Sequence, residues 1–64
     1  MTGDANDDGV VNIIDALITA QYYVGLLSTL PALNNADTNC DGVVNIIDAL
    51  LIAQYYVGII TEFC

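Results

Sequence analysis

Oxygen-bearing side chains and a glycine recur at fixed spacing in two twelve-residue segments, 4–15 and 37–48. In each segment, Asp or Asn stands at the first, third, fifth, ninth and twelfth positions, and Gly stands at the sixth. Carboxylate and amide oxygens are hard ligands, and Ca²⁺ takes about six to eight of them. The two segments therefore predict two calcium sites.

This spacing is that of an EF-hand loop, whose seventh residue adds a main-chain carbonyl and whose glycine permits a sharp bend. Mg²⁺ is a weaker alternative because it needs a tighter octahedron, and Asp/Asn/Gly clusters also form ordinary turns. Two complete matches favour calcium, with the ninth ligand acting directly or through water. The expected ligands are Asp4, Asn6, Asp8, the carbonyl of Val10, Asn12 and Asp15 in the first loop, and Asp37, Asn39, Asp41, the carbonyl of Val43, Asn45 and Asp48 in the second.

The charge composition limits what else the chain can do. Its 64 residues include eight acids and no Lys, Arg or His, which gives a net charge of −8. Two Ca²⁺ ions would halve this charge, so folding should be coupled to metal binding. Nucleic acid and anionic membranes are not expected partners of such a chain, and it has no Lys or His for general-base work and no basic neighbour to activate its hydroxyl groups, so catalysis is not expected. No apolar run is long enough for membrane insertion.

Internal repetition shows which elements position the loops. Residues 4–27 and 37–60 differ at only six of their 24 paired positions. After each loop, the segments Ile13–Val24 and Ile46–Val57 contain neither Pro nor Gly, and each is followed by a glycine. This pattern predicts two helices that end at a glycine with positive φ. The fold class is therefore expected to be all-α.

The segment 28–36 connects the two repeats. A short helix is expected to begin at its single proline, and Leu30 and Leu33 are expected to pack beneath the repeats. Just after the loop glycines, Val11 and Val44 could pair as a short two-stranded bridge that holds the loops back to back. A core this small needs additional stabilisation, which the metal would supply.

Only three residues precede the first loop here, whereas an ordinary EF-hand has a helix on both sides of its loop. The loop-helix-connector-loop-helix order and the Asp at loop end resemble a dockerin, a small domain that plugs cellulosomal enzymes or scaffolds into cohesin domains. The resemblance covers residues 3–60, through the segment Gly3-Asp4-Ala5-Asn6-Asp7-Asp8-Gly9 with Asn12-Ile13-Ile14-Asp15 and its echo from Ala36 to Asp48.

The resemblance implies a single dockerin domain over residues 1–64, with two Ca-loop-helix repeats and calcium-dependent folding. It also implies no catalysis, an extracellular location, and a cohesin domain of a scaffoldin as the partner in a polysaccharide-degrading complex. The expected boundaries are repeat one 4–27, connector 28–36, repeat two 37–60 and C-terminal tail 61–64.

Helix periodicity predicts a partner-binding face. Both sides of each helix are apolar, and only one side can be buried in the domain. In dockerins, the residues before the twelfth loop ligand and the outer helical stripe contact cohesin. By resemblance, the partner-binding residues are Ile13, Ile14, Leu17, Ile18 and Gln21, with their counterparts Ile46, Ile47, Leu50, Leu51 and Gln54. The alternative, above all for Leu17 and Leu50, is a place in the core.

Two features of this face depart from, or extend, the family pattern. Many dockerins carry hydroxyl residues before the last loop ligand and a basic pair in the helix, whereas this chain has Ile-Ile and Ala-Gln. The interface should therefore depend on apolar burial rather than on ion pairs. Because the two repeats carry nearly the same residues, we expect two binding orientations.

The two cysteines suggest a disulfide. Cys40 stands at a non-ligand position of the second loop, and Cys64 ends the sequence. A tail that folds back along the second helix could reach this loop, since twelve helical residues span about 18 Å and six extended residues about 20 Å. A Cys40–Cys64 bond would add roughly 3.5 kcal/mol of stability. Free thiols are the alternative.

Two other functions are open at this stage. The first is an EF-hand-like calcium buffer or sensor. A sensor opens by moving one helix against another around the loop, so the missing helix before each loop argues against it. The second is a dockerin-like adhesion module outside any cellulosome.

Overall fold

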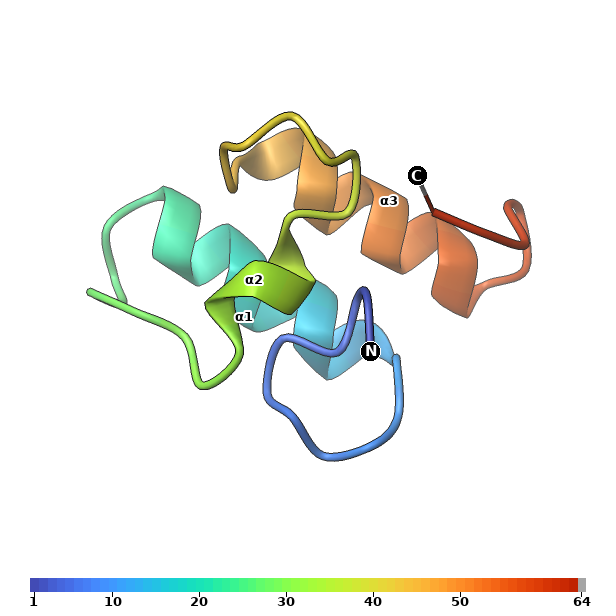
Figure 1. Cartoon of the computed structure of the whole chain (residues 1–64), viewed down its shortest axis with the longest axis horizontal. Coiled ribbons are helices and arrows are strands. Elements are labelled where there is room, and N and C mark those ends of the chain that lie inside the picture. The colour runs from blue at the N-terminus through green and yellow to red at the C-terminus, as the bar shows by residue number, and fades with distance from the viewer. Residues whose placement is uncertain (64) are drawn as a thin grey trace.

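The computed structural model describes residues 1–63, and in this range it contains three helices and no strand. The helices are α1 (Ile13–Tyr23), α2 (Leu33–Ala36) and α3 (Ile46–Tyr56), which confirms the expected all-α class. Helices α1 and α3 pack together and run in roughly opposite directions, with one twelve-residue loop leading into each (Figure 1). None of these helices has the length and apolarity needed to cross a bilayer.

Both long helices begin with the same capping box. The side-chain oxygen of Asn12 accepts a hydrogen bond from the N–H of Ile14 (3.0 Å), and Asp15 accepts one from the N–H of Asn12 (2.8 Å). Asn45 and Asp48 repeat the arrangement at α3. These bonds satisfy N–H groups that have no partner within a helix. The ninth and twelfth loop residues thus also start the helix.

The two long helices also end in the same way. Gly25 has a φ of +89°, the N–H of Leu26 donates to the carbonyl of Gln21 (2.9 Å), and the N–H of Gly25 donates to that of Tyr22 (3.2 Å). This pair of bonds is a Schellman motif, which requires a residue with positive φ. Gly58 fills the same place after α3. Each helix ends one residue earlier than predicted because the cap begins there.

The connector lies at the centre of the core. Leu30 is buried together with Ala5 and Ala36, and the partly buried residues around them are Ile18, Tyr22, Leu27, Leu33 and Val44. The prediction that the connector leucines pack beneath the repeats is confirmed. The short helix α2 begins two residues after the proline at which it was expected. Its N-terminus has no side-chain cap that would extend it backward.

The predicted bridge between Val11 and Val44 is wrong, since no strand or bridge occurs within residues 1–63. Each valine is instead packed at a separate site. Val44 lies against the core cluster. A methyl group on Gly3 would lie 3.2 Å from Cγ1 of Val11. Two apolar residues after a loop glycine are too short a pattern to distinguish strand pairing from ordinary packing.

The tail returns to the start of the first loop. Gly3 has a φ of +90°, and a Cβ there would lie only 2.6 Å from Cε2 of Phe63. The Phe63 ring therefore covers the bare face of this glycine, and it also meets Tyr55 of α3. We call these three residues the aromatic clasp.

Candidate calcium loops and partner-binding face

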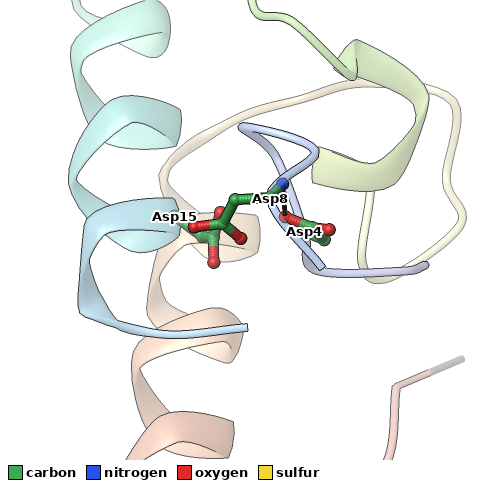
Figure 2. Close-up of side chains that lie close together, drawn as sticks. All are labelled: Asp4, Asp8 and Asp15. Atoms are coloured by element: carbon green, nitrogen blue, oxygen red, sulfur yellow. Dashed lines mark hydrogen bonds between the residues drawn. The ribbon is translucent and has the colours of Figure 1, made fainter. Parts of the chain in front are cut away.

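Three carboxylates converge in the first loop. Oxygens of Asp4, Asp8 and Asp15 all lie within 4.8 Å of one another. Asp15 reaches from the first turn of α1 toward the two loop residues (Figure 2). Asp4 accepts hydrogen bonds from the N–H groups of Asp8 (3.1 Å) and Gly9 (2.9 Å). The main chain thus orients the carboxylates, and each still has lone pairs for a cation.

Asp4 lies inside the loop and is only 2% exposed. Burial raises the pKa of its carboxyl, but hydrogen bonds from the N–H groups of Gly9 and Asp8 outweigh this effect and hold the pKa below its ordinary value. Bonds of this kind favour the ionised form. The first loop residue is therefore kept as the anion that a metal ion requires.

The second loop gathers its carboxylates in the same way. Oxygens of Asp37, Asp41 and Asp48 also lie within 4.8 Å of one another. Oδ2 of Asp37 accepts a hydrogen bond from the N–H of Gly42 (3.0 Å), whereas its Oδ1 is buried and has no hydrogen-bond partner among residues 1–63. An unsatisfied buried oxygen costs free energy that a bound cation would recover. All the expected ligand atoms, this one included, are oxygens, and such a set fits Ca²⁺.

Left-handed backbone bends both loops. Asp7 and Cys40, at the fourth positions, have φ values of +59° and +58°, and Gly9 and Gly42, at the sixth positions, have +88° and +87°. Two residues with positive φ within three positions turn the chain so tightly that the carboxylates of the loop face one another. Gly adopts this conformation without cost and Asp tolerates it, whereas it strains a cysteine. The same φ at Asp7 and at the strained Cys40 shows that loop shape prevails over local preference.

The residues at the third position of each loop lie beside the carboxylate clusters. Asn6 donates from Nδ2 to Oδ2 of Asp8 (3.2 Å), and its Oδ1 accepts from the N–H of Asp8 (3.2 Å). Oδ1 of Asn39 accepts from the N–H of Asp41 (3.3 Å). Both amide groups therefore lie beside the fifth loop residue, as the ligand spacing predicts.

The seventh and ninth loop residues have different surroundings. Val10 and Val43 expose their side chains, so that only their main chains are available to the loop. The side-chain oxygens of Asn12 and Asn45 cap the helices, as described above. Because this oxygen already accepts a helix N–H, a contact with the ion through water suits the ninth residue better than direct ligation.

Thr38 was not singled out from the sequence, although it holds the twelfth ligand of the second loop. It is fully buried, and it donates to Oδ1 of Asp48 from its N–H (3.1 Å) and from its hydroxyl (3.3 Å). The first repeat has Ala5 at this position and instead places the hydroxyl of Thr19 against the carbonyl of Asp15 (2.7 Å). The sequence signal for this role was a hydroxyl residue next to the first ligand in the second repeat, where the first repeat has alanine.

The predicted partner-binding residues divide into exposed and half-buried groups. Exposed at the surface are Ile13, Ile14, Leu17, Ile46, Ile47 and Leu50. Half-buried are Ile18, Gln21, Leu51 and Gln54. Ile18 packs against the core cluster, whereas Leu17 and Leu50 are not core residues. We call the six exposed residues the isoleucine-leucine face.

Further exposed apolar side chains, beyond the partner-binding residues predicted above, lie around the helix ends. These are Tyr23, Val24 and Leu26 in the first repeat and Tyr56, Val57 and Ile59 in the second. Val24 follows Leu17 by seven positions, which is two helical turns, so that helical spacing could have indicated it. These side chains enlarge the apolar surface beyond the isoleucine-leucine face.

Cys40 is disulfide-bonded. Its expected partner, Cys64, lies outside the described residues 1–63. The specific pairing of these two cysteines therefore stays a prediction.

Comparisons with known proteins relate this arrangement to a family. A family model described as the dockerin type I domain matches residues 2–57. Among solved structures, the chain is similar to one in the complex of the third cohesin ScaC with a variant ScaB dockerin from Acetivibrio cellulolyticus, with 32% identity and a TM-score of 0.95. That match covers 98% of this chain and 90% of the other. The comparison with curated proteins found no match.

Two further complexes contain similar chains. The first, a type I cohesin–dockerin complex from Clostridium thermocellum, gives 36% identity and a TM-score of 0.90 over 98% of this chain and 94% of that one. The second joins the sixth cohesin of scaffoldin B from Acetivibrio cellulolyticus to a Cel5 dockerin variant, and it gives 33% identity and a TM-score of 0.88. This last match covers 98% of this chain and 100% of the other.

Proposed function

This chain belongs to the dockerin type I family, and on that premise we propose that it is a calcium-dependent module that binds a cohesin domain of a scaffoldin. The similar chains come from structures of dockerins bound to cohesins. The module would thereby attach its parent protein to an extracellular, polysaccharide-degrading cellulosome. It would act as one domain over residues 1–64, with repeats at 4–27 and 37–60.

The observation that carries this proposal is the exposed apolar surface on both long helices. Ile13 and Ile46 are 47% and 46% exposed, and Leu17 and Leu50 are each 51% exposed. A chain of 64 residues with a small core gains stability from each apolar side chain that it buries. Six large side chains left in solvent on two matched helices therefore favour a surface made for a protein partner.

The matched exposure also favours two binding orientations. The two helices run in opposite directions (Figure 1). They expose the same residue types to solvent. A rotation that exchanges the repeats would bring nearly the same side chains to the same partner positions. We therefore propose a dual binding mode in which either helix can make the dominant contact with one cohesin.

Both calcium loops would stabilise the helices that carry this surface. The proposed ligands are the twelve loop positions predicted from the sequence, and each loop holds one Ca²⁺. Asp15 and Asp48 belong at once to a carboxylate cluster and to the first turn of a long helix. An ion on these residues would fix the start of the helix, where Ile13 and Ile46 begin the isoleucine-leucine face. Calcium would thus have a structural role, and the module would bind its partner without any catalytic activity of its own.

The chemistry of the interface would be apolar. The chain carries no Lys, Arg or His, so it can offer no cation to a partner. Acidic side chains are concentrated in the loops, and only Asp7 and Glu62 lie outside the predicted ligand positions. Affinity would therefore come from burial of isoleucine and leucine, with few contributions from ion pairs.

A calcium-dependent pull-down against a panel of cohesins tests the proposal, with calorimetry on any cohesin retained. The variant Ile13→Asp/Ile14→Asp and the variant Ile46→Asp/Ile47→Asp should each still bind, because the other helix remains intact. All four changes together should abolish binding. Ser28→Asp/Thr29→Asp, which adds the same charge to the exposed connector, is the matched control.

Each outcome has a distinct meaning. Loss of binding on changing one pair alone would contradict the dual mode. Full binding by the fourfold variant would exclude the isoleucine-leucine face as the interface. Failure of the unchanged chain to bind any cohesin in the presence of Ca²⁺ would overturn the proposed function itself.

A further inference from the structure

The two calcium loops differ at only two of their twelve positions, and both differences lie beside expected ligands. Ala5 in the first loop corresponds to Thr38 in the second, and Asp7 corresponds to Cys40. We propose that the two sites are unequal, and that the first loop binds Ca²⁺ more tightly than the second. This inference rests on the proposed calcium sites and concerns the residues that set their relative strength.

The first difference is one of charge. Asp7 gives the first loop a fourth carboxylate, whereas the second loop has three. Asp7 is exposed, has a positive φ and stands between the expected ligands Asn6 and Asp8, so its charge would act on a bound ion from outside the ligand set. One additional negative charge within about a Debye length of a divalent ion in water strengthens binding by about threefold to tenfold at low salt.

The second difference concerns the freedom of the twelfth ligand. Oδ1 of Asp48 accepts hydrogen bonds from the N–H groups of Thr38 and Asn39, and the hydroxyl of Thr38 shares its one proton between this oxygen and the carbonyl of Asp48, each 3.3 Å away. Among residues 1–63, Oδ1 of Asp15 accepts one hydrogen bond, of 3.3 Å, from the N–H of Asn6. Aspartate is one methylene shorter than the glutamate usual at this position and must turn toward the ion. Donors on its oxygen oppose that movement, and they do so more strongly in the second loop.

One observation on the second loop acts in the opposite direction. Oδ1 of Asp37 is buried without a hydrogen-bond partner in the described residues, whereas both oxygens of Asp4 accept main-chain N–H groups. Binding of the ion would satisfy this oxygen and thereby strengthen the second site. The charge of Asp7 and the donors on Asp48 outweigh this contribution. As free Ca²⁺ falls, the second loop empties first, and the start of α3 loses its support before the start of α1. Under the dual mode, docking through α1 persists to lower calcium.

Amide NMR signals of Gly9 and Gly42 can report each loop separately, because each N–H donates to the first ligand of its own loop. Following both signals while free Ca²⁺ is raised with a chelator buffer should show Gly9 reaching its bound position at a severalfold lower concentration. Asp7→Asn, which keeps a residue that tolerates positive φ, should shift the Gly9 transition upward. Thr38→Ala should shift the Gly42 transition downward, and the two changes together should bring the transitions close together.

Two comparisons make the result specific. Glu62→Gln removes the same charge as Asp7→Asn, but at the exposed tail, and should leave the separation unchanged. Thr38→Ala copies the residue that the first repeat already carries at this position. Coincident transitions in the unchanged chain, or an earlier Gly42 transition, would overturn the inference. If neither signal responds to Ca²⁺, the proposed calcium sites themselves fail.

Discussion

The ring of Phe63 stacks on the ring of Tyr55, with centroids 4.7 Å apart and planes inclined by 23°. Tyr55 lies near the end of α3, and the other contact of Phe63 is Gly3, directly before the first calcium loop. The ring therefore connects the second repeat to the entry of the first loop. Stacked aromatic pairs contribute beyond the area that they bury.

Phe63→Ala should lower the free energy of unfolding by about 1–3 kcal/mol, because it removes half-buried apolar area together with the aromatic pair. Chemical denaturation in saturating Ca²⁺ measures the effect. The neighbouring exposed residue supplies the control, since Glu62→Ala should change stability by no more than about 0.5 kcal/mol. Equal stability of the two variants would show that the clasp contributes nothing.

Gly3→Ala should also destabilise the domain, because the new Cβ would lie 2.6 Å from a Phe63 ring carbon and the residue must keep a φ of +90°. Combining it with Phe63→Ala removes the clash but not the backbone strain, so the double variant should lose less than the sum of the single changes. A double-mutant cycle by denaturation gives this coupling. Strict additivity would mean that the two residues do not meet in solution.

Removing Ca²⁺ with a chelator should unfold the chain or leave only residual helix, because six carboxylates are held together with no basic residue to balance them. Circular dichroism during a calcium titration should show helix forming as the ion binds. A fully helical form without Ca²⁺ that rearranges on binding would instead support the sensor alternative.

Binding to a cohesin should depend weakly on salt. No cation on this chain can form an ion pair across the interface, and the isoleucine-leucine face carries no charge. Calorimetry at saturating Ca²⁺ should give nearly the same dissociation constant when ionic strength is raised from about 0.05 M to about 0.5 M, and a negative heat-capacity change. A steep loss of affinity with salt would show that the acidic loops make the contact.

The carboxyl of Asp4 should titrate below its ordinary pKa of 3.8. Burial acts in the opposite direction, but the hydrogen bonds from Gly9 and Asp8 prevail. Because the folded pKa is depressed, the stability contributed by Asp4 is fully present above the unfolded pKa and is lost as pH falls through the folded pKa. Carbon NMR of the Asp4 carboxyl group during acidification in saturating Ca²⁺ measures this. A bound ion lowers the pKa further, so a value above 3.8 would contradict the prediction.

Much of this fold could be predicted because the repeated pattern fixes local structure. Asn12 and Asp15 must be close in sequence to form a capping box, and a glycine two residues after Tyr23 must end α1. The predicted ligands Asp4, Asp8 and Asp15 converge because the loop bends twice through residues with positive φ.

Other features depend on contacts between distant segments, which no local pattern encodes. The stacking of Phe63 on Tyr55 requires the tail to return across α3. The expected pairing of Val11 with Val44 does not occur, because each valine packs at a separate site. The role of Thr38 became visible only when its hydroxyl was placed against Asp48. Exposure of Leu17 and Leu50 likewise depended on which helix face turned inward.

The equal exposure of Ile13 and Ile46 has a statistical consequence for assembly. If two docked poses are equivalent, the complex has twice as many bound configurations as a single-pose complex of the same contacts. That multiplicity alone lowers the binding free energy by about 0.4 kcal/mol. An attached domain could then flip between poses when neighbours crowd it, so that steric conflict on a filled scaffold is relieved without giving up any contact.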